Sequence, residues 1–154
     1  MKVARFSVGL CLVAALALAI SFRSSLVAAP PEVAAAKPVE ADMHEFMEYV
    51  FQPTYLRLKP AMASEPKDRG GWKTIKADSL SLAEAGNLLL GRSPEKDDKV
   101  WDELSIAVRE SGGNLYQAAK KKDYKEARQH FETMLKKCNA CHDKYAGGEH
   151  QLSP

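Results

Sequence analysis

Apolar positions recur every three or four residues from about residue 42 to residue 145, the spacing typical of amphipathic helices. No stretch of alternating β-branched residues indicates a strand, and no internal repeat is visible. The pattern divides into four predicted helices, which cover residues 42–62, 72–90, 95–121 and 123–145. We therefore expect an all-α protein.

The first predicted helix carries one apolar stripe that Pro53 interrupts. Because proline lacks a backbone N–H, Pro53 should kink or restart this helix. The stripe consists of Met43, Phe46, Met47, Val50 and Phe51.

The other three helices have one core face each, and punctuating residues separate them. Gly91 ends the second, Ser93-Pro94 opens the third, and Asp123 is the predicted N-cap of the fourth, which Gly147-Gly148 stops. The paired Gly112 and Gly113 inside the third helix suggest a close approach, for example to a cofactor, or a kink. The core faces are Ile75, Leu82, Ala85 and Leu89; then Trp101, Leu104, Val108, Leu115 and Ala118; then Tyr124, Ala127, Phe131, Met134, Cys138, Cys141 and Tyr145. Short connections predict an up-down-up-down four-helix bundle over residues 42–146, followed by a C-terminal tail, residues 147–154.

Residues 1–29 have the features of a secretory signal peptide. Lys2 and Arg5 precede an apolar run, and Val27-Ala28-Ala29 fits a cleavage site, with residues 34–36 as a second option. The apolar run is shorter than the ~20 residues of a membrane span, so an uncleaved anchor is the alternative. Residues 30–41 are predicted to be a flexible lead-in. The mature protein is expected in the periplasm, with no stable membrane insertion after cleavage.

Charge excludes one class of partner. Removing Lys2, Arg5 and Arg23 from the 22 basic residues leaves 19 against 20 acidic ones, a net charge of about −1. Such a balance does not favour nucleic acid, and the run Lys120-Lys121-Lys122 fits a solvated helix end or, alternatively, a contact for an acidic redox partner.

The fourth helix ends in the sequence Cys138-Asn139-Ala140-Cys141-His142, a C-x-x-C-H motif. This motif attaches a c-type haem, because the two thiols add to the haem vinyl groups and the imidazole binds the iron. On a helix, Cys138, Cys141 and His142 share one face. The motif predicts one covalently bound haem c. A thioredoxin-like redox pair or half of a zinc site are the alternatives, but the first lacks a βαβ context and the second lacks further ligands.

The position of the motif near the end of the chain resembles the cytochrome c prime superfamily, the class II cytochromes c. The residues that carry the resemblance are Phe131 and the stretch 138–145 on a last helix, with Trp72 and Trp101 before them. One departure is Ala146, where members of this family often have a basic residue beside the proximal imidazole. The resemblance also implies that a homodimer through the first two helices can occur.

In this family the residue on the other side of the iron distinguishes the functions. Met47 or Met43 is the candidate distal ligand, with Met47 favoured by its placement, and the low-spin, Met-ligated branch is the closest. His44 as ligand, or an open site walled by Phe46, Val50 and Phe51, are the alternatives.

These ligand sets predict different functions. A Met ligand predicts an exported monohaem cytochrome that transfers electrons to redox partner proteins. An open site predicts binding of NO or CO. We expect no enzyme, because the chain offers no distal His-Arg pair for a peroxidase and no hydrolase triad.

Overall fold

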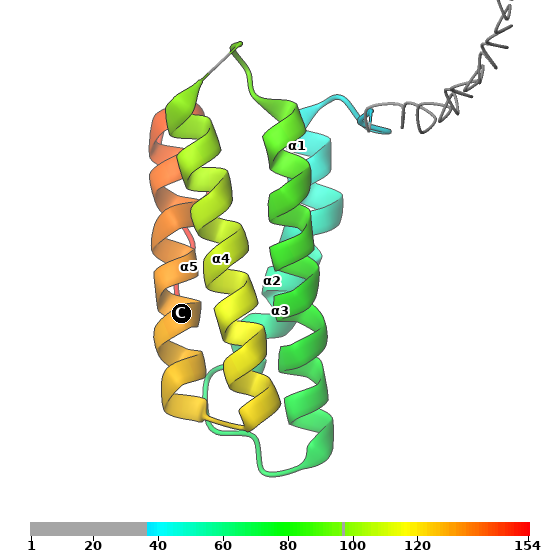
Figure 1. Cartoon of the computed structure of the whole chain (residues 1–154), viewed down its shortest axis with the longest axis vertical. Helices are drawn as coiled ribbons and strands as arrows, with labels where there is room; N and C mark the ends of the chain where they lie inside the picture. The colour runs from blue at the N-terminus through cyan, green and yellow to red at the C-terminus, as the bar shows by residue number, and fades with distance from the viewer. Residues whose placement is uncertain (1–36, 97) are drawn as a thin grey trace, which may run out of the picture. The chain divides into compact units, whose positions relative to one another are not determined.

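The computed structural model describes residues 37–96 and 98–154. The predicted signal peptide and most of the predicted lead-in lie outside these residues; residues 37–41 are exposed and precede the first helix. The described chain forms four helical segments that alternate in direction (Figure 1), so the predicted four-helix bundle is confirmed. The elements are α1 (Met43–Phe46), η1 (Met47–Phe51), α2 (Gln52–Ala61), α3 (Arg69–Leu89), η2 (Leu90–Arg92), α4 (Lys99–Lys121) and α5 (Tyr124–Tyr145).

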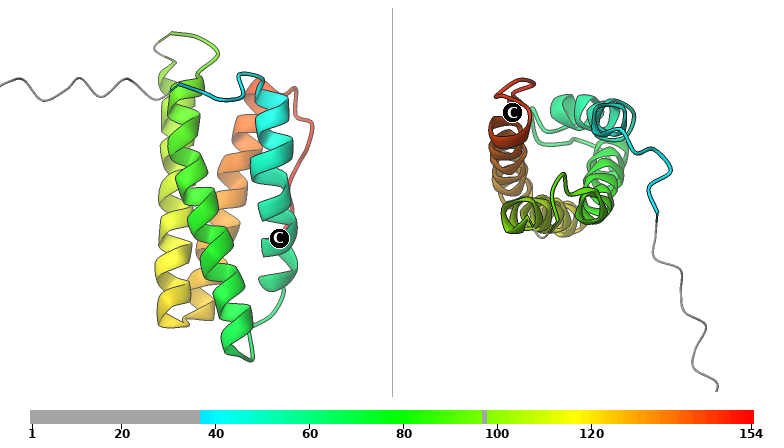
Figure 2. Two further views of the ribbon diagram at one scale, coloured as in Figure 1. Left: turned by 90° about the vertical axis from the view of Figure 1, so that its right-hand side faces the viewer. Right: turned by 90° about the horizontal axis from the view of Figure 1, so that it is seen from above.

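The four segments stand at the corners of a square when seen along the bundle axis (Figure 2). The first segment consists of α1, η1 and α2, whose backbone stays helical throughout. Helix α3 packs against α2 and α4, and α4 packs against α5. The remaining side, between the first segment and α5, contains the candidate site described below.

An aspartate caps the start of each helical segment. Its side chain accepts a hydrogen bond from a backbone N–H of the first turn, which has no partner within the helix. The four caps are Asp42, Asp68, Asp98 and Asp123. The predicted cap at Asp123 is confirmed. Helix α4, however, begins at Lys99 and not at residue 95, because Asp98 is its cap and Ser93-Pro94 lies in the preceding loop.

Pro53 is accommodated by a wider turn. The backbone N–H of Gln52 bonds to the carbonyl of Met47, five residues back, which is the π-helical pattern of η1. Pro53 then falls in the first turn of α2, where no backbone donor is needed. The extra residue in this turn rotates the following side chains by about 100°. Val50 lies inside this wider turn and is exposed, so its predicted place in the apolar stripe is wrong.

Gly112 lets α3 and α4 approach closely. A Cβ atom at Gly112 would lie 3.1 Å from the backbone nitrogen of Ala83, whereas a Cβ at Gly113 would meet nothing within 4 Å. Gly86 of α3 faces the backbone of Arg109 in the same way, at 3.0 Å. The packing reason expected for the Gly112-Gly113 pair is therefore a helix–helix contact made by the first glycine alone.

Two hydrophobic clusters fill the bundle. The smaller one consists of Phe46, Leu89 and Trp101, near the end of the bundle where α5 finishes. The larger one fills the rest of the core and includes Leu58, Ile75, Leu115, Phe131 and Met134. Because each helix contributes one apolar face to these clusters, their burial is the main stabilising term of the fold.

Helix α5 ends at two glycines, as predicted. Gly147 and Gly148 have positive φ values of 62° and 78°, which glycine adopts without steric cost. The chain then turns back, and residues 149–154 run alongside α5 (Figure 2). Within the described residues, no helix has the length and apolar character needed to cross a membrane.

Candidate functional site

A cavity of about 600 Å³ lies between the first helical segment, α3, α4, α5 and the C-terminal residues. Its volume is in the range of small-ligand and cofactor sites, and its walls are mainly apolar. The lining side chains include Met43, Met47, Phe51, Leu82, Leu89, Trp101, Leu104, Val108, Met134, Leu135, Cys138, Cys141, His142, Tyr145 and Leu152.

The three residues of the haem motif all line this cavity from α5. Cys138 packs against the larger hydrophobic cluster and Cys141 against the smaller one, so the cavity lies between the two clusters. His142 follows on the same face, as the helical spacing predicts. Both cysteines are free thiols. Burial raises the pKa of Cys138 to about 12 and that of Cys141 to about 11, because an apolar wall disfavours the thiolate.

These residues fit a covalently bound haem. Two sulfur atoms and one imidazole lie on one wall of an apolar cavity of sufficient size, which is the donor set that a c-type haem uses. A structural zinc site needs four protein ligands, one more than these three residues supply. Among the residues that the structure describes, no group of three or more His, Cys, Asp and Glu side chains could hold a metal ion.

The first helical segment brings the distal candidates to the same cavity. Met43 and Met47 line it and pack against the Phe46, Leu89 and Trp101 cluster, which Cys141 also contacts. Their half-buried side chains are one turn apart on the same face. The structure thus places both methionines across from the haem motif.

The other predicted distal residues are placed differently. His44 reaches the cavity edge, but it is exposed and lies 3.5 Å from the carboxylate of Glu48. Of the predicted aromatic wall, Phe51 lines the cavity and Phe46 is buried behind it, with the two rings edge to face at 5.6 Å. Val50 faces solvent, which corrects its predicted place in that wall.

A hydrogen-bonded pair closes the end of the cavity. The Tyr145 hydroxyl donates to Oδ2 of Asp98 at 2.7 Å, while Oδ1 of the same carboxylate caps α4. The Tyr145 ring meets Trp101 edge to face at 5.0 Å, and the indole N–H of Trp101 donates to the carbonyl of Leu89. One aspartate therefore joins the start of α4 to the end of α5.

This arrangement shifts the pKa of both partners. The hydrogen bond from Tyr145, followed by the backbone N–H of Trp101, lowers the pKa of Asp98 below its ordinary value of 3.8. Burial, followed by the hydrogen bond to Asp98, raises the pKa of Tyr145 to about 12. The sequence pattern gives no signal for Asp98, which falls inside the helix predicted over residues 95–121, and none for its contact with Tyr145.

A second contact that the sequence does not reveal concerns His142. Its Nδ1 atom lies 3.0 Å from the backbone carbonyl oxygen of His150, in the returning C-terminal residues. His150 itself has a positive φ of 57°, which turns the chain at this point. The predicted C-terminal tail is thus part of the wall of the candidate site.

Comparison with known proteins agrees with this arrangement. The sequence model of a family described as cytochrome c′ matches residues 95–146, which include α4, α5 and the complete haem motif. A search of curated proteins found no match. Proteins of the cytochrome c′ family are helical bundles with a covalently bound c-type haem, and they are typically periplasmic. The part of the bundle that carries the haem motif at the end of its last helix is therefore similar to the cytochrome c′ family, the class II cytochromes c.

Proposed function

We propose that the protein is an exported monohaem cytochrome c that transfers electrons. Cys138 and Cys141 hold the haem through thioether bonds, His142 is the proximal ligand, and Met47 or Met43 is the distal ligand. The observation that carries the proposal is the placement of both methionines and the haem motif on facing walls of one apolar cavity.

The residues of the chain suit this role. The haem, when bound, supplies an iron that accepts and releases one electron. The apolar walls exclude water, and thioether coordination favours the reduced state relative to coordination by two imidazoles. Both axial groups belong to the protein, so the proposal assigns no substrate to the iron and no enzymatic reaction to the chain.

Export of the protein is part of the proposal. It rests on the predicted signal peptide and agrees with a haem that is attached outside the cytoplasm.

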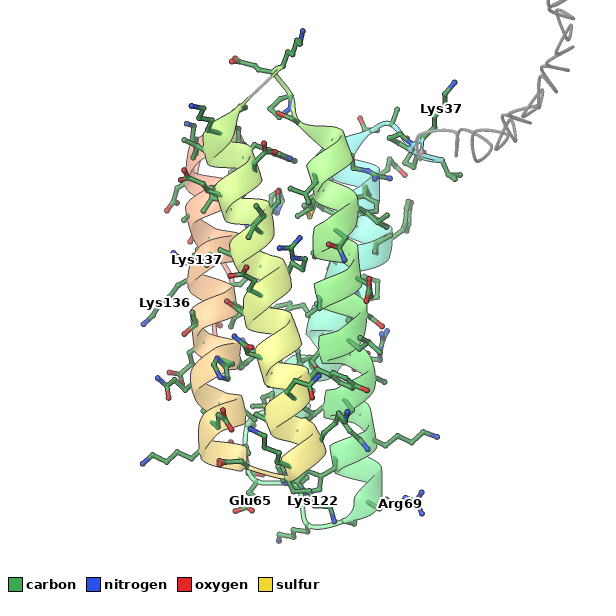
Figure 3. All side chains as sticks on the ribbon, in the orientation of Figure 1. Lys37, Glu65, Arg69, Lys122, Lys136 and Lys137 are labelled. Carbon is green, nitrogen blue, oxygen red and sulfur yellow. The ribbon has the colours of Figure 1, made fainter. Side chains whose placement is uncertain are left out.

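The partners would be redox proteins of the periplasm, which need close access to the haem. The run Lys120–Lys122 lies at the end of α4. Counted along α5 at 1.5 Å per residue, this end of the bundle is roughly 24 Å from Cys138. Figure 3 shows Lys122 at one end of the bundle and Lys136 and Lys137 beside the middle of α5.

The test is the absorption spectrum and mass of the mature protein, produced in a host with working cytochrome c maturation. We expect one haem added per chain and low-spin spectra in both oxidation states, with the weak long-wavelength band of methionine bound to ferric iron. A Cys138→Ser, Cys141→Ser variant should lose the covalent haem. Colourless protein with the mass of the bare peptide would contradict the proposal.

Gas binding is the other outcome of the same experiment. High-spin spectra and rapid uptake of CO by the ferrous protein would show that the protein binds NO or CO and does not act in electron transfer.

A further inference from the structure

The C-terminal residues lie across the side of the bundle where the first segment faces α5. Leu152 is held on α5 by the Asn139 side chain, whose amide nitrogen donates to the Leu152 carbonyl at 2.9 Å and whose oxygen accepts from the Leu152 N–H at 2.8 Å. Ser153 is held on α2 by Tyr55, whose hydroxyl donates to the Ser153 carbonyl at 2.8 Å and lies 3.2 Å from its N–H. We call residues 150–153 the proximal strap.

The strap is tied down by more than its backbone. Lys59 of α2 donates to the Ser153 hydroxyl at 2.6 Å, and Gln151 donates to Asp143 of α5 at 2.9 Å. Leu152 is half-buried against the larger hydrophobic cluster. These contacts join α5 to α2 and fix the backbone of the strap next to the haem motif.

One hydrogen bond joins the strap backbone to the candidate iron ligand, and the His150 ring also lies edge to face with the His142 ring at a centroid distance of 6.5 Å. The carbonyl oxygen of His150 can only accept a hydrogen bond, so Nδ1 of His142, 3.0 Å away, must carry the proton. In this tautomer Nε2 has a free lone pair for a metal. A hydrogen bond from the second nitrogen also fixes the orientation of the ring and makes the imidazole a stronger donor.

We propose that the strap positions and tunes the proximal histidine, with the His150 carbonyl as the acceptor and Asn139 as the residue that holds it in place. The inference rests on the proposed attachment of haem at this motif. Asn139 is the first variable position between the two cysteines, and its side chain faces the strap and not the cavity. It is a positioning residue, because it acts on His142 through the strap backbone.

The proposal predicts the direction of two changes. When the hydrogen bond to Nδ1 is lost, His142 becomes a weaker donor, so the ferric state is less stabilised and the reduction potential rises. The Nδ1 proton is then exposed, and its exchange with solvent should accelerate about tenfold, the factor expected for one net hydrogen bond.

The experiment uses the mature haem-loaded protein and three variants. Asn139→Ala removes both bonds to Leu152, and Asn114→Ala removes an amide from an exposed position of α4 as the matched control. His150→Asn removes the imidazole of His150 but keeps its carbonyl, and asparagine tolerates a positive φ. The readouts are the reduction potential and the NMR exchange rate of the His142 Nδ1 proton in the ferrous protein, as its CO adduct if the iron is high-spin.

We expect Asn139→Ala to raise the potential and accelerate exchange, while Asn114→Ala and His150→Asn stay close to the wild type. Equal values for Asn139→Ala and Asn114→Ala would overturn the proposal. A full shift in His150→Asn would overturn it as well, because the side chain and not the carbonyl would then act. Wild-type protein that takes up no haem would instead refute the proposed function on which the strap depends.

A truncated chain ending at Gly148 provides an independent check, since it removes the whole strap. If it folds with haem, its potential and exchange rate should change at least as much as those of Asn139→Ala. Unchanged values would overturn the proposal. If the chain does not fold, the decision rests on Asn139→Ala.

Discussion

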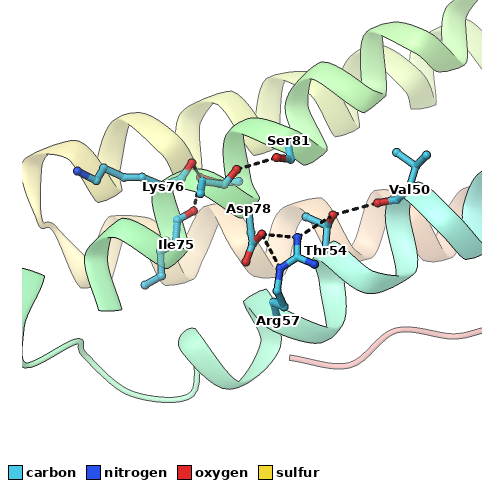
Figure 4. A network of polar contacts seen from close by, with 9 residues as sticks. Val50, Thr54, Arg57, Ile75, Lys76, Asp78 and Ser81 are labelled. Carbon is cyan, nitrogen blue, oxygen red and sulfur yellow. Dashed lines mark hydrogen bonds and ion pairs between the residues drawn. The ribbon is translucent and has the colours of Figure 1, made fainter. Parts of the chain in front are cut away.

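Arg57 of α2 donates two hydrogen bonds to the same oxygen of Asp78 on α3, from Nε at 3.1 Å and Nη2 at 2.7 Å (Figure 4). The second oxygen of Asp78 is buried and has no hydrogen-bond partner among the residues that the structure describes, and the residue is only 4% exposed. Asp78 therefore depends on Arg57 for its charge balance. The pair fixes α2 against α3, and with it the segment that carries Met43 and Met47.

Replacing Arg57 should destabilise the protein more than a surface ion pair would. Arg57→Ala leaves a buried carboxylate without its donors, and we expect a loss of about 1–3 kcal/mol in the free energy of unfolding. Urea denaturation measures it. Arg69→Ala, at the exposed start of α3, is the control and should change the free energy by less than about 0.5 kcal/mol. Equal effects would show that the Arg57 contact is not stabilising.

The two methionines can be distinguished by their variants. If Met47 is the distal ligand, Met47→Leu should convert the low-spin spectrum to a high-spin one, because leucine keeps the volume but has no sulfur. Met43→Leu should then keep the low-spin spectrum. The reverse result would identify Met43. Low-spin spectra in both single variants and in the double variant would exclude the two residues as ligands.

The adjacent glycines of α4 should respond in opposite directions. Gly112→Ala forces a Cβ to within 3.2 Å of the Ala83 backbone, and we expect a destabilisation of about 1–3 kcal/mol from overpacking. Gly113→Ala has open space and gains helix propensity, so it should stabilise the protein by about 0.5–1 kcal/mol. Thermal or urea unfolding measures the stability of both variants. Destabilisation by Gly113→Ala would contradict the packing described.

The Asp98–Tyr145 pair should make stability depend on pH at both extremes. Because the pKa of Asp98 is lowered, its contribution is complete above its ordinary value of 3.8 and is lost as the pH falls through the lower folded pKa. Because the pKa of Tyr145 is raised to about 12, its contribution is present below the ordinary value of 10.0 and is lost as the pH rises toward 12.

Melting temperatures against pH test this pair. Asp98→Asn should have a smaller drop below about pH 4 than the wild type, because it has no carboxylate to protonate there. Tyr145→Phe should remove the loss at high pH. Asp123→Asn changes the cap of α5 without contacting the phenol, so its high-pH behaviour should remain that of the wild type. Identical profiles for all four proteins would refute the assignment.

Helical periodicity was sufficient to predict the bundle and the location of the haem motif. Each amphipathic stripe records how one helix meets the core, so Leu82, Val108 and Phe131 could be assigned to the interior without any knowledge of their partners. The spacing of Cys138, Cys141 and His142 likewise defines one helical face by itself. Such local patterns can be recognised in a single sequence.

Features that depend on two distant segments were not predictable. The contact between Tyr55 and Ser153 joins residues 98 positions apart, and a single stripe does not encode it. The misplacement of Val50 has a local cause, because a proline can be met by a kink, a restart or a π turn, and each gives a different rotation of the stripe. The close packing at Gly112 could not be predicted either, because it depends on Ala83 of the neighbouring helix.

The thiols of the haem-free protein should react slowly while it is folded. With its pKa raised from 9.0 to about 11, Cys141 has a thiolate fraction about a hundredfold below that of an ordinary thiol at neutral pH. We expect alkylation of folded, haem-free protein to be slower than in urea by at least this factor. Circular dichroism confirms that the helices are present, and equal rates with and without urea would contradict the expectation.

Slow thiols have a consequence for biogenesis. Thioether formation needs reactive sulfur atoms, and both thiols lie half-buried on the apolar wall of the cavity, where the thiolate is disfavoured. If the haem is attached at these thiols, the thioethers would form more readily before the last helix docks, so collapse of the bundle and ligation of the prosthetic group would compete in time. A variant that folds faster without its haem would, for that reason alone, yield less mature cytochrome.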